Sequence, residues 1–181
     1  MLPTGHVAAG YLTAKALLHF SHQQFTPSQQ IELAWWGMFF GFAPDLDVFY
    51  YFFKNKTLLV AGQPSDGKSH RKFITHAPVL WAIPGLIVYF FATSPFVRYI
   101  GLLFWLGSWS HFILDTVEYG IMWLWPLSDR VYAIKGREEK GFITEQNFFK
   151  HSIQFLKFYS TKLSFYLEVA IILVAIYIAI Q

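Results

Sequence analysis

Residues 99–118 read YIGLLFWLGSWSHFILDTVE, an apolar run of helical length that carries ionisable side chains toward its end. His111 and Asp115 are four residues apart, so on a helix they share one face, and Glu118 continues that face three residues later. Two carboxylates at this spacing repel each other in apolar surroundings unless a cation lies between them. The run therefore predicts an apolar helix with one polar, functional face.

The composition indicates a membrane protein. Of the 181 residues, 55% are hydrophobic, 20% are aromatic and only 14% are charged. A soluble domain would carry about 25% charged residues. Aromatic side chains are typical of the interface between a bilayer and water. Together with the long apolar runs, this composition predicts a multi-pass membrane protein.

Apolar segments along the chain predict the fold class. A membrane-spanning helix needs about 20 apolar residues. Because the first segment is short and PDLD interrupts the second, we predict an all-α, multi-pass transmembrane helical bundle with four to five spans. The sequence NFFKHSIQFLKFY has apolar spacing that predicts an amphipathic interfacial helix before the last span. The segments are residues 7–20, 31–53, 77–93, 99–118 and 163–180.

The predicted organisation is one integral membrane domain, residues 1–181. Residues 1–128 form its core, residues 129–162 a cytoplasmic loop with the interfacial helix, and residues 163–181 a C-terminal transmembrane helix.

Basic residues are concentrated in two loops. Residues 54–75 contain five and residues 126–162 contain seven of the fourteen Lys and Arg. Alternating spans put both loops on one side, and such an excess marks the cytoplasmic side of a membrane. Anionic lipid headgroups account for the basic loops, so we expect membrane lipids as partners and no nucleic acid.

Histidines and aspartates from four segments are predicted to meet near the cytoplasmic ends of the spans. Ionisable groups at such depths are usually functional. The chain has no cysteine, so any metal ligands must be nitrogen or oxygen. This chemistry favours a divalent ion, zinc first and manganese or iron as alternatives, with one or two ions in the site. The predicted metal ligands are His6, Asp45, His70, His76, His111 and Asp115.

Each pattern also has a simpler interpretation. His111 and Asp115 would then be a hydrogen-bonded pair, and the aspartates of PDLD would satisfy backbone groups at a helix end. His70 would belong to a basic loop that touches lipid phosphates.

The motifs together resemble a known family. In chain order they are TGHVAAG (residues 4–10), PDLD (44–47), HRKFITH (70–76), GSWSHFILD (107–115) and LWPLS (124–128). This ordered set is similar to the YdjM family of predicted membrane-bound metal-dependent hydrolases. The resemblance implies a multi-pass bacterial or archaeal inner-membrane protein with a metal site. It further implies a distant relation to the zinc-dependent phospholipase C and P1 nuclease group, whose helical members cleave phosphoesters with clustered zinc ions.

The expected function is a metal-dependent hydrolase at the cytoplasmic face of the membrane, acting on a phosphoester such as a phospholipid headgroup. Glu118 is predicted to accept a proton, Arg71 to hold phosphate, and Asp47 to bridge metals or orient a histidine. Two alternatives stay open. One is a non-enzymatic metal-binding membrane protein, and the other is a structural membrane protein with a hydrogen-bonded polar cluster.

Overall fold

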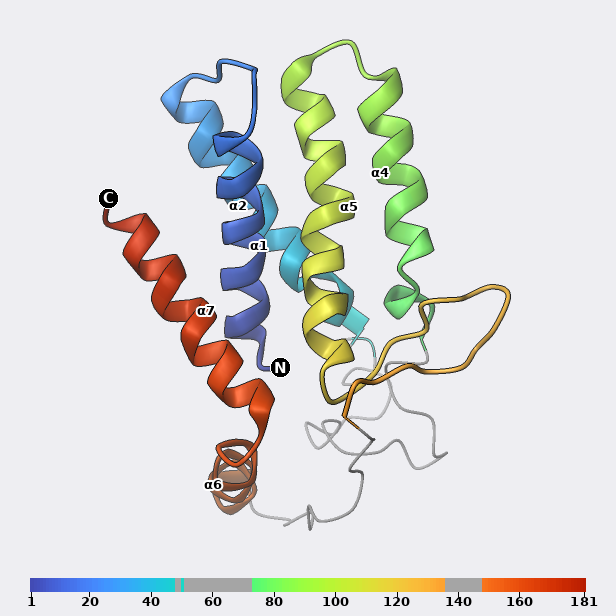
Figure 1. Cartoon of the computed structure of the whole chain (residues 1–181), viewed down its shortest axis with the longest axis vertical. Coiled ribbons are helices and arrows are strands. Elements are labelled where there is room, and N and C mark those ends of the chain that lie inside the picture. Colours follow the sequence, from blue (N-terminus) through green and yellow to red (C-terminus); the bar gives the residue numbers. More distant parts are fainter. Residues whose placement is uncertain (48–49, 51–72, 136–147) are drawn as a thin grey trace.

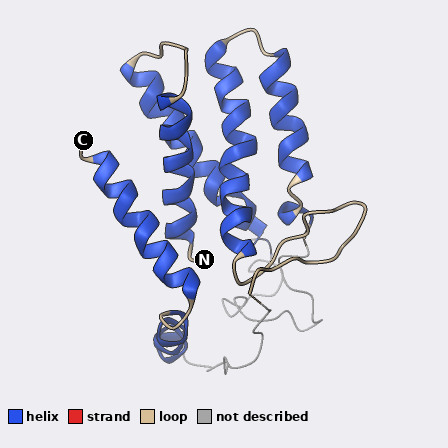
Figure 2. Cartoon of the chain, in the orientation of Figure 1, coloured by secondary structure: helices blue, strands red, loops and turns tan. Residues whose placement is uncertain are grey.

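A computed structural model describes residues 1–47, 50, 73–135 and 148–181. Most of these residues are helical, with loops between the helices, an isolated bridge between Ile121 and Tyr132 and no named strand in the described part of the chain (Figure 2). The all-α part of the predicted fold class is therefore confirmed. The elements are α1 (Pro3–His19), α2 (Pro27–Phe42), η1 (Ala43–Leu46), η4 (Ile74–His76), α4 (Val79–Phe91), α5 (Pro95–Thr116), α6 (Phe148–Tyr159) and α7 (Leu163–Ala179).

Helices α1 and α2 form a tight helical hairpin. Thr26 begins α2 with a capping box, in which its side chain accepts from the Gln29 backbone N–H while the Gln29 side chain accepts from Thr26 N. Pro27 at the first helical position needs no N–H partner, so the start of α2 is sharply defined. The chain can therefore turn back within a few residues of the end of α1.

Glycines let the two backbones of this hairpin touch. A Cβ added at Gly10 would lie 2.1 Å from Gly37 O, and one added at Gly41 would lie 2.4 Å from His6 O. Both obstacles are backbone atoms, which cannot move aside as a side chain can. Gly10, Gly37 and Gly41 therefore fix the distance between α1 and α2, and with it the position of His6 beside α2.

Helix α5 packs against this hairpin through the hydrophobic core. Leu33 and Phe40 of α2, Leu103 of α5 and Ala14 of α1 are buried together. Helix α4 lies beside α5 on its other side, joined to it by a short turn that ends at Pro95 (Figure 1). Gly85 of α4 and Gly101 of α5 bring these two backbones close together as well.

Helix α7 runs diagonally across α1 and closes the bundle on that side (Figure 1). Its first turn is held by Glu118, which accepts hydrogen bonds from Leu163 N (3.1 Å) and Ser164 N (3.3 Å) and from the Ser164 hydroxyl. Helix α6 precedes it, at the position where the sequence predicts an interfacial helix.

The predicted multi-pass transmembrane bundle, with its four to five spans, is wrong. Among the described residues no helix combines the length and the apolar character needed to cross a membrane. Helices α1, α2, α4 and α7 have 17, 16, 13 and 17 residues, fewer than the about 20 apolar residues that a membrane-spanning helix needs. Helix α5 has 22 residues but contains serines, His111 and Asp115. The assignment of the basic loops to one side of the membrane depended on these spans and loses its support.

Candidate metal centre

Five predicted ligands come together at one end of the bundle. His6 lies in the first turns of α1, Asp45 in η1, His76 at the end of η4, and His111 and Asp115 in the last turns of α5. Because α1 starts where α5 ends, these helix ends lie at the same level (Figure 1). We call these five residues the His–Asp cluster.

Short 3₁₀ turns deliver Asp45 and His76. Helix α2 passes directly into η1, whose Pro44 ends the regular helix and leaves Asp45 in the tight turn. His76 closes η4, just before Pro78 at the N-cap of α4. The motifs PDLD and FITH are thus both turns that place a polar side chain against α5.

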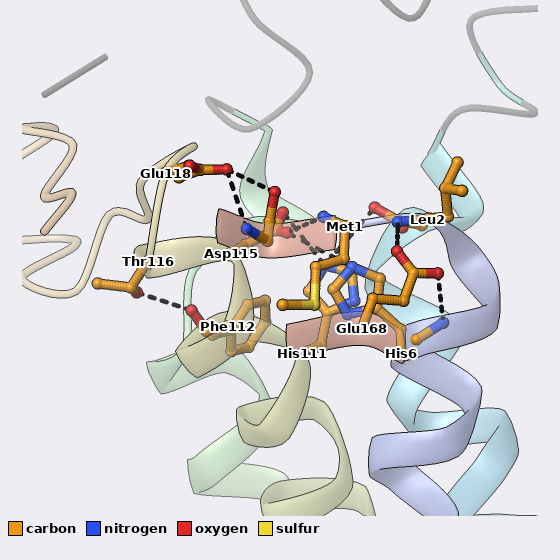
Figure 3. A network of polar contacts seen from close by, with 12 residues as sticks. Met1, Leu2, His6, His111, Phe112, Asp115, Thr116, Glu118 and Glu168 are labelled. Carbon is orange, nitrogen blue, oxygen red and sulfur yellow. Dashed lines mark hydrogen bonds and ion pairs between the residues drawn. The ribbon is translucent and has the colours of Figure 1, made fainter. Parts of the chain in front are cut away.

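His6 and His111 form a stacked pair. Their ring centroids are 3.7 Å apart with an interplanar angle of 24°, and both residues are fully buried (Figure 3). His111 Nδ1 lies 3.1 Å from Gly41 O; since a carbonyl only accepts, Nδ1 carries the proton. The Nε2 of His111 therefore keeps a free lone pair, which points at Asp45 and Asp115.

His76 is held on its other side by Asp47. Its Nδ1 lies 3.3 Å from Asp47 Oδ2 and 3.2 Å from the Thr75 hydroxyl, which itself donates to Asp47 at 3.0 Å. Its Nε2 faces Asp45 Oδ1 at 3.4 Å. Asp47 therefore orients the His76 ring so that Nε2 points into the cluster.

Burial and charge set the protonation states. Burial lowers the pKa of His111 to about 3, and the adjacent His6 acts in the same direction, so His111 is neutral at pH 7. Burial alone would lower the pKa of His76, but the carboxylates of Asp45 and Asp47 that face its two ring nitrogens raise it to about 9. Burial alone would also raise the pKa of Asp45, yet His76 holds it well below its usual value. Asp45 is therefore ionised and His111 neutral, as metal ligands must be, whereas His76 is protonated at pH 7 and would release that proton to a bound metal.

Contacts within the cluster are too long for charged hydrogen bonds, which measure about 2.7–2.9 Å. Two ligands bound at about 2.0–2.1 Å to a tetrahedral ion lie about 3.3–3.4 Å apart. The observed separations are close to that value. They are 3.4 Å for His6 Nε2 to Asp115 Oδ1, 3.4 Å for His76 Nε2 to Asp45 Oδ1, 3.6 Å for His111 Nε2 to Asp45 Oδ1 and 3.8 Å for His111 Nε2 to Asp115 Oδ2.

The ring nitrogens of His6 and Nε2 of His111 are buried without hydrogen-bond partners among the described residues. A buried polar atom without a partner is costly, and a divalent ion would satisfy these lone pairs. The donor set therefore fits a metal ion. Two overlapping ligand groups have atoms within 4.8 Å of one another, namely His6 with Asp45 and His111, and His76 with His111 and Asp115.

Other predicted site residues lie elsewhere. Glu118, three residues after Asp115, contacts the first turn of α7. Its predicted role as a base stays a prediction. His70 and Arg71 lie outside the described residues.

Two contacts near the His–Asp cluster were not predicted from the sequence. The Met1 amino group donates to Asp115 Oδ1 at 2.8 Å, and Glu168 of α7 is buried beside the first turn of α1 (Figure 3). Glu168 lies inside the apolar run of residues 163–180, and a lone acid in such a run was the signal that could have found it.

Comparison with known proteins gives the family. A model of the YdjM inner membrane protein family matches residues 1–181, whereas no curated protein and no solved structure matches the chain. The family expected from the motifs is confirmed, while the hydrolase activity and the relation to phospholipase C stay predictions. Because the match covers every residue, the chain belongs to the YdjM inner membrane protein family.

Proposed function

We propose that this chain binds a divalent metal ion in the His–Asp cluster and uses it to hydrolyse a phosphoester. The observation that carries the metal site is the spacing of the ligand atoms, which matches the edges of a tetrahedral coordination shell better than a set of hydrogen bonds. Zinc is the favoured ion because the donors are imidazole and carboxylate; manganese and iron accept the same ligands.

Because His111 is shared by the two ligand groups, the described ligands favour a single bound ion. Both ligand groups contain His111, and its Nδ1–H is committed to Gly41 O. A neutral imidazole then has one lone pair, on Nε2, and ligates one ion. A second ion would need a bridging carboxylate together with a ligand from outside the cluster, such as the predicted His70.

The chemistry follows from the charges around the ion. A bound divalent ion supplies a positive charge that lowers the pKa of water toward ~7, so a nucleophile is available at neutral pH. Asp47 keeps the His76 ring oriented, and the stacked rings of His6 and His111 shield one side of the cluster from solvent. The phosphoester substrate is supported by the motif resemblance and by the family's membrane location, which brings phospholipid headgroups within reach.

A second candidate is a non-enzymatic metal-binding protein, and burial favours it. His6, His76 and His111 are 0% exposed and Asp115 is 1% exposed. Only the Asp45 side chain, at 14%, reaches solvent among the five. A substrate must therefore approach beside Asp45 if the protein is an enzyme.

Metal analysis of Asp115→Asn tests the site directly. The purified wild-type protein is expected to contain close to one zinc, manganese or iron ion per chain by elemental analysis. Asp115→Asn keeps the shape but removes the charge, so the metal content should fall to a small fraction of the wild-type value. The matched control is Asp129→Asn, an exposed loop residue, which should keep its metal.

Turnover then separates the two candidates. Wild-type protein loaded with metal should release product from bis(p-nitrophenyl) phosphate or from phospholipid vesicles, and chelator should stop it. Metal binding without turnover on either would leave the non-enzymatic candidate, while a metal-free wild-type protein would refute both.

Asp47→Asn is expected to weaken metal binding without removing any ligand. The substitution takes away the negative charge that faces His76 Nδ1. Loss of such an outer partner costs about 10–100-fold in metal affinity. The dissociation constant from a competition titration should rise by that factor relative to Asp129→Asn. An unchanged constant would mean that Asp47 does not support the site.

A further inference from the structure

Glu168 is a buried carboxylate with an unusually full set of donors. Its Oε1 accepts from the Thr4 hydroxyl at 2.6 Å and from Gly5 N at 3.1 Å. Its Oε2 accepts from Leu2 N at 3.1 Å and from the Tyr159 hydroxyl. Burial and this carboxylate together raise the pKa of Tyr159, so its phenol stays protonated and donates.

These four bonds give Glu168 a role other than metal binding. An ionised carboxylate offers about four lone-pair sites, and all of them are engaged here. Helix α1 has no side-chain cap of its own, because its N-cap residue is Leu2. Glu168 therefore supplies from α7 the acceptor that the first turn of α1 lacks, and its negative charge lies at the positive end of that helix.

The bonded backbone leads directly into the cluster. Gly5 precedes His6, whose ring stacks on His111. Helix α7 is also bonded to the segment that follows α5. Glu118, three residues after Asp115, accepts hydrogen bonds from the backbone N–H groups of Leu163 and Ser164 in α7. Helix α7 thus contacts the segment after α5, which carries Asp115, through Glu118, and the start of α1, which carries His6, through Glu168.

We infer that Glu168 is a positioning residue for the metal site, acting through the first turn of α1 to hold His6 against His111 and Asp115. The inference rests on the proposed metal binding. The inference gives α7 a role in metal binding, although α7 contains none of the five cluster residues.

Gly5 offers a variant that separates positioning from general stability. A Cβ at this position would lie 2.8 Å from Glu168 Cγ and 3.0 Å from its Cδ, so Gly5→Ala must push the carboxylate away. Alanine also favours a helix over glycine, and the substitution removes no polar group. A purely structural role of Glu168 therefore predicts a change in stability with unchanged metal affinity in Gly5→Ala, whereas a positioning role predicts weaker metal binding.

The experiment measures zinc affinity and the visible absorption spectrum of the cobalt-substituted full chain. We expect the dissociation constant to rise about 10–100-fold in Glu168→Ala and in Gly5→Ala, with a smaller rise in Glu168→Gln, which keeps one acceptor oxygen. The cobalt bands, which report ligand geometry, should shift in the same order. Glu32→Gln, an exposed glutamate of α2, is the matched control and should match wild type in both readouts.

The outcomes distinguish the inference from the proposed function. Wild-type affinity and cobalt spectra in folded Glu168→Gln and Gly5→Ala would overturn the role of Glu168 while leaving the metal site intact. A wild-type protein that takes up neither zinc nor cobalt would instead refute the metal site, and the positioning role with it.

Discussion

Replacing His111 with alanine is expected to abolish metal binding. His111 belongs to both ligand groups of the His–Asp cluster, so no group keeps three ligands without it. Changes outside the coordination shell already cost about 10–100-fold in affinity, and loss of a shared ligand should exceed about 100-fold. Metal at about 100 times its dissociation constant stabilises the wild-type fold by about 2.7 kcal/mol, and this gain should vanish in His111→Ala. Thermal unfolding with and without added zinc measures it.

The control is His19→Ala, which removes an exposed histidine at the opposite end of α1. It should keep the full stabilisation by zinc, because it lies far along the helix from His6. If His111→Ala still gained as much stability from zinc as His19→Ala, the His–Asp cluster would not be the zinc site, and hydrogen bonding between helices would be its remaining role.

Gly10→Ala is expected to be the most destabilising small substitution in the bundle. The new methyl group would lie 2.1 Å from Gly37 O and 3.0 Å from Gly41 Cα, so α1 and α2 must separate. Overpacking typically costs about 1–3 kcal/mol, and contact with backbone should put this case at the upper end of that range or beyond it. Because Gly41 O orients His111, metal affinity should fall together with the free energy of unfolding.

Gly107→Ala is the matched control in α5. Its nearest obstacle is Phe40 Cβ at 3.2 Å, and the backbone oxygen of Gly37 is 3.5 Å away. Both variants gain the same helix propensity, about 0.8–1.0 kcal/mol, so the difference between them isolates the close approach. Denaturant unfolding of the two variants should differ by more than about 2 kcal/mol. Equal stabilities would show that α1 and α2 are not in backbone contact.

Much of the helical architecture was predictable from apolar runs. The runs at residues 77–93 and 99–118 correspond to α4 and α5, and the polar face carrying His111 and Asp115 does point at the other cluster residues. The membrane spans were wrong because apolar runs were equated with helices long enough to cross a bilayer. The run at residues 77–93 contains a helix of 13 residues, and η1 ends the regular part of the second run.

Contacts between distant residues limited what could be predicted about the site. The stack of His6 on His111 depends on the backbone contact at Gly10 and Gly41, and nothing in the spacing of either histidine indicates it. The contact of Glu118 with the start of α7 depends on the turn after α5, while its role as a base stays a prediction. Such positions are set by chain geometry beyond one helix, so a helical repeat cannot reveal them.

The bonds of Glu168 also impose an order in time. The hydrogen-bond partners of Glu168 in α1 are Leu2, Thr4 and Gly5, which precede it in the sequence by 166, 164 and 163 positions. During synthesis, these residues and the adjacent His6 therefore leave the ribosome more than a hundred and fifty residues before Glu168. The first turn of α1 therefore has no carboxylate acceptor while most of the nascent chain is being made. Closing so long a loop is a late event in folding, so the final geometry around His6 is established only after α7 has been translated.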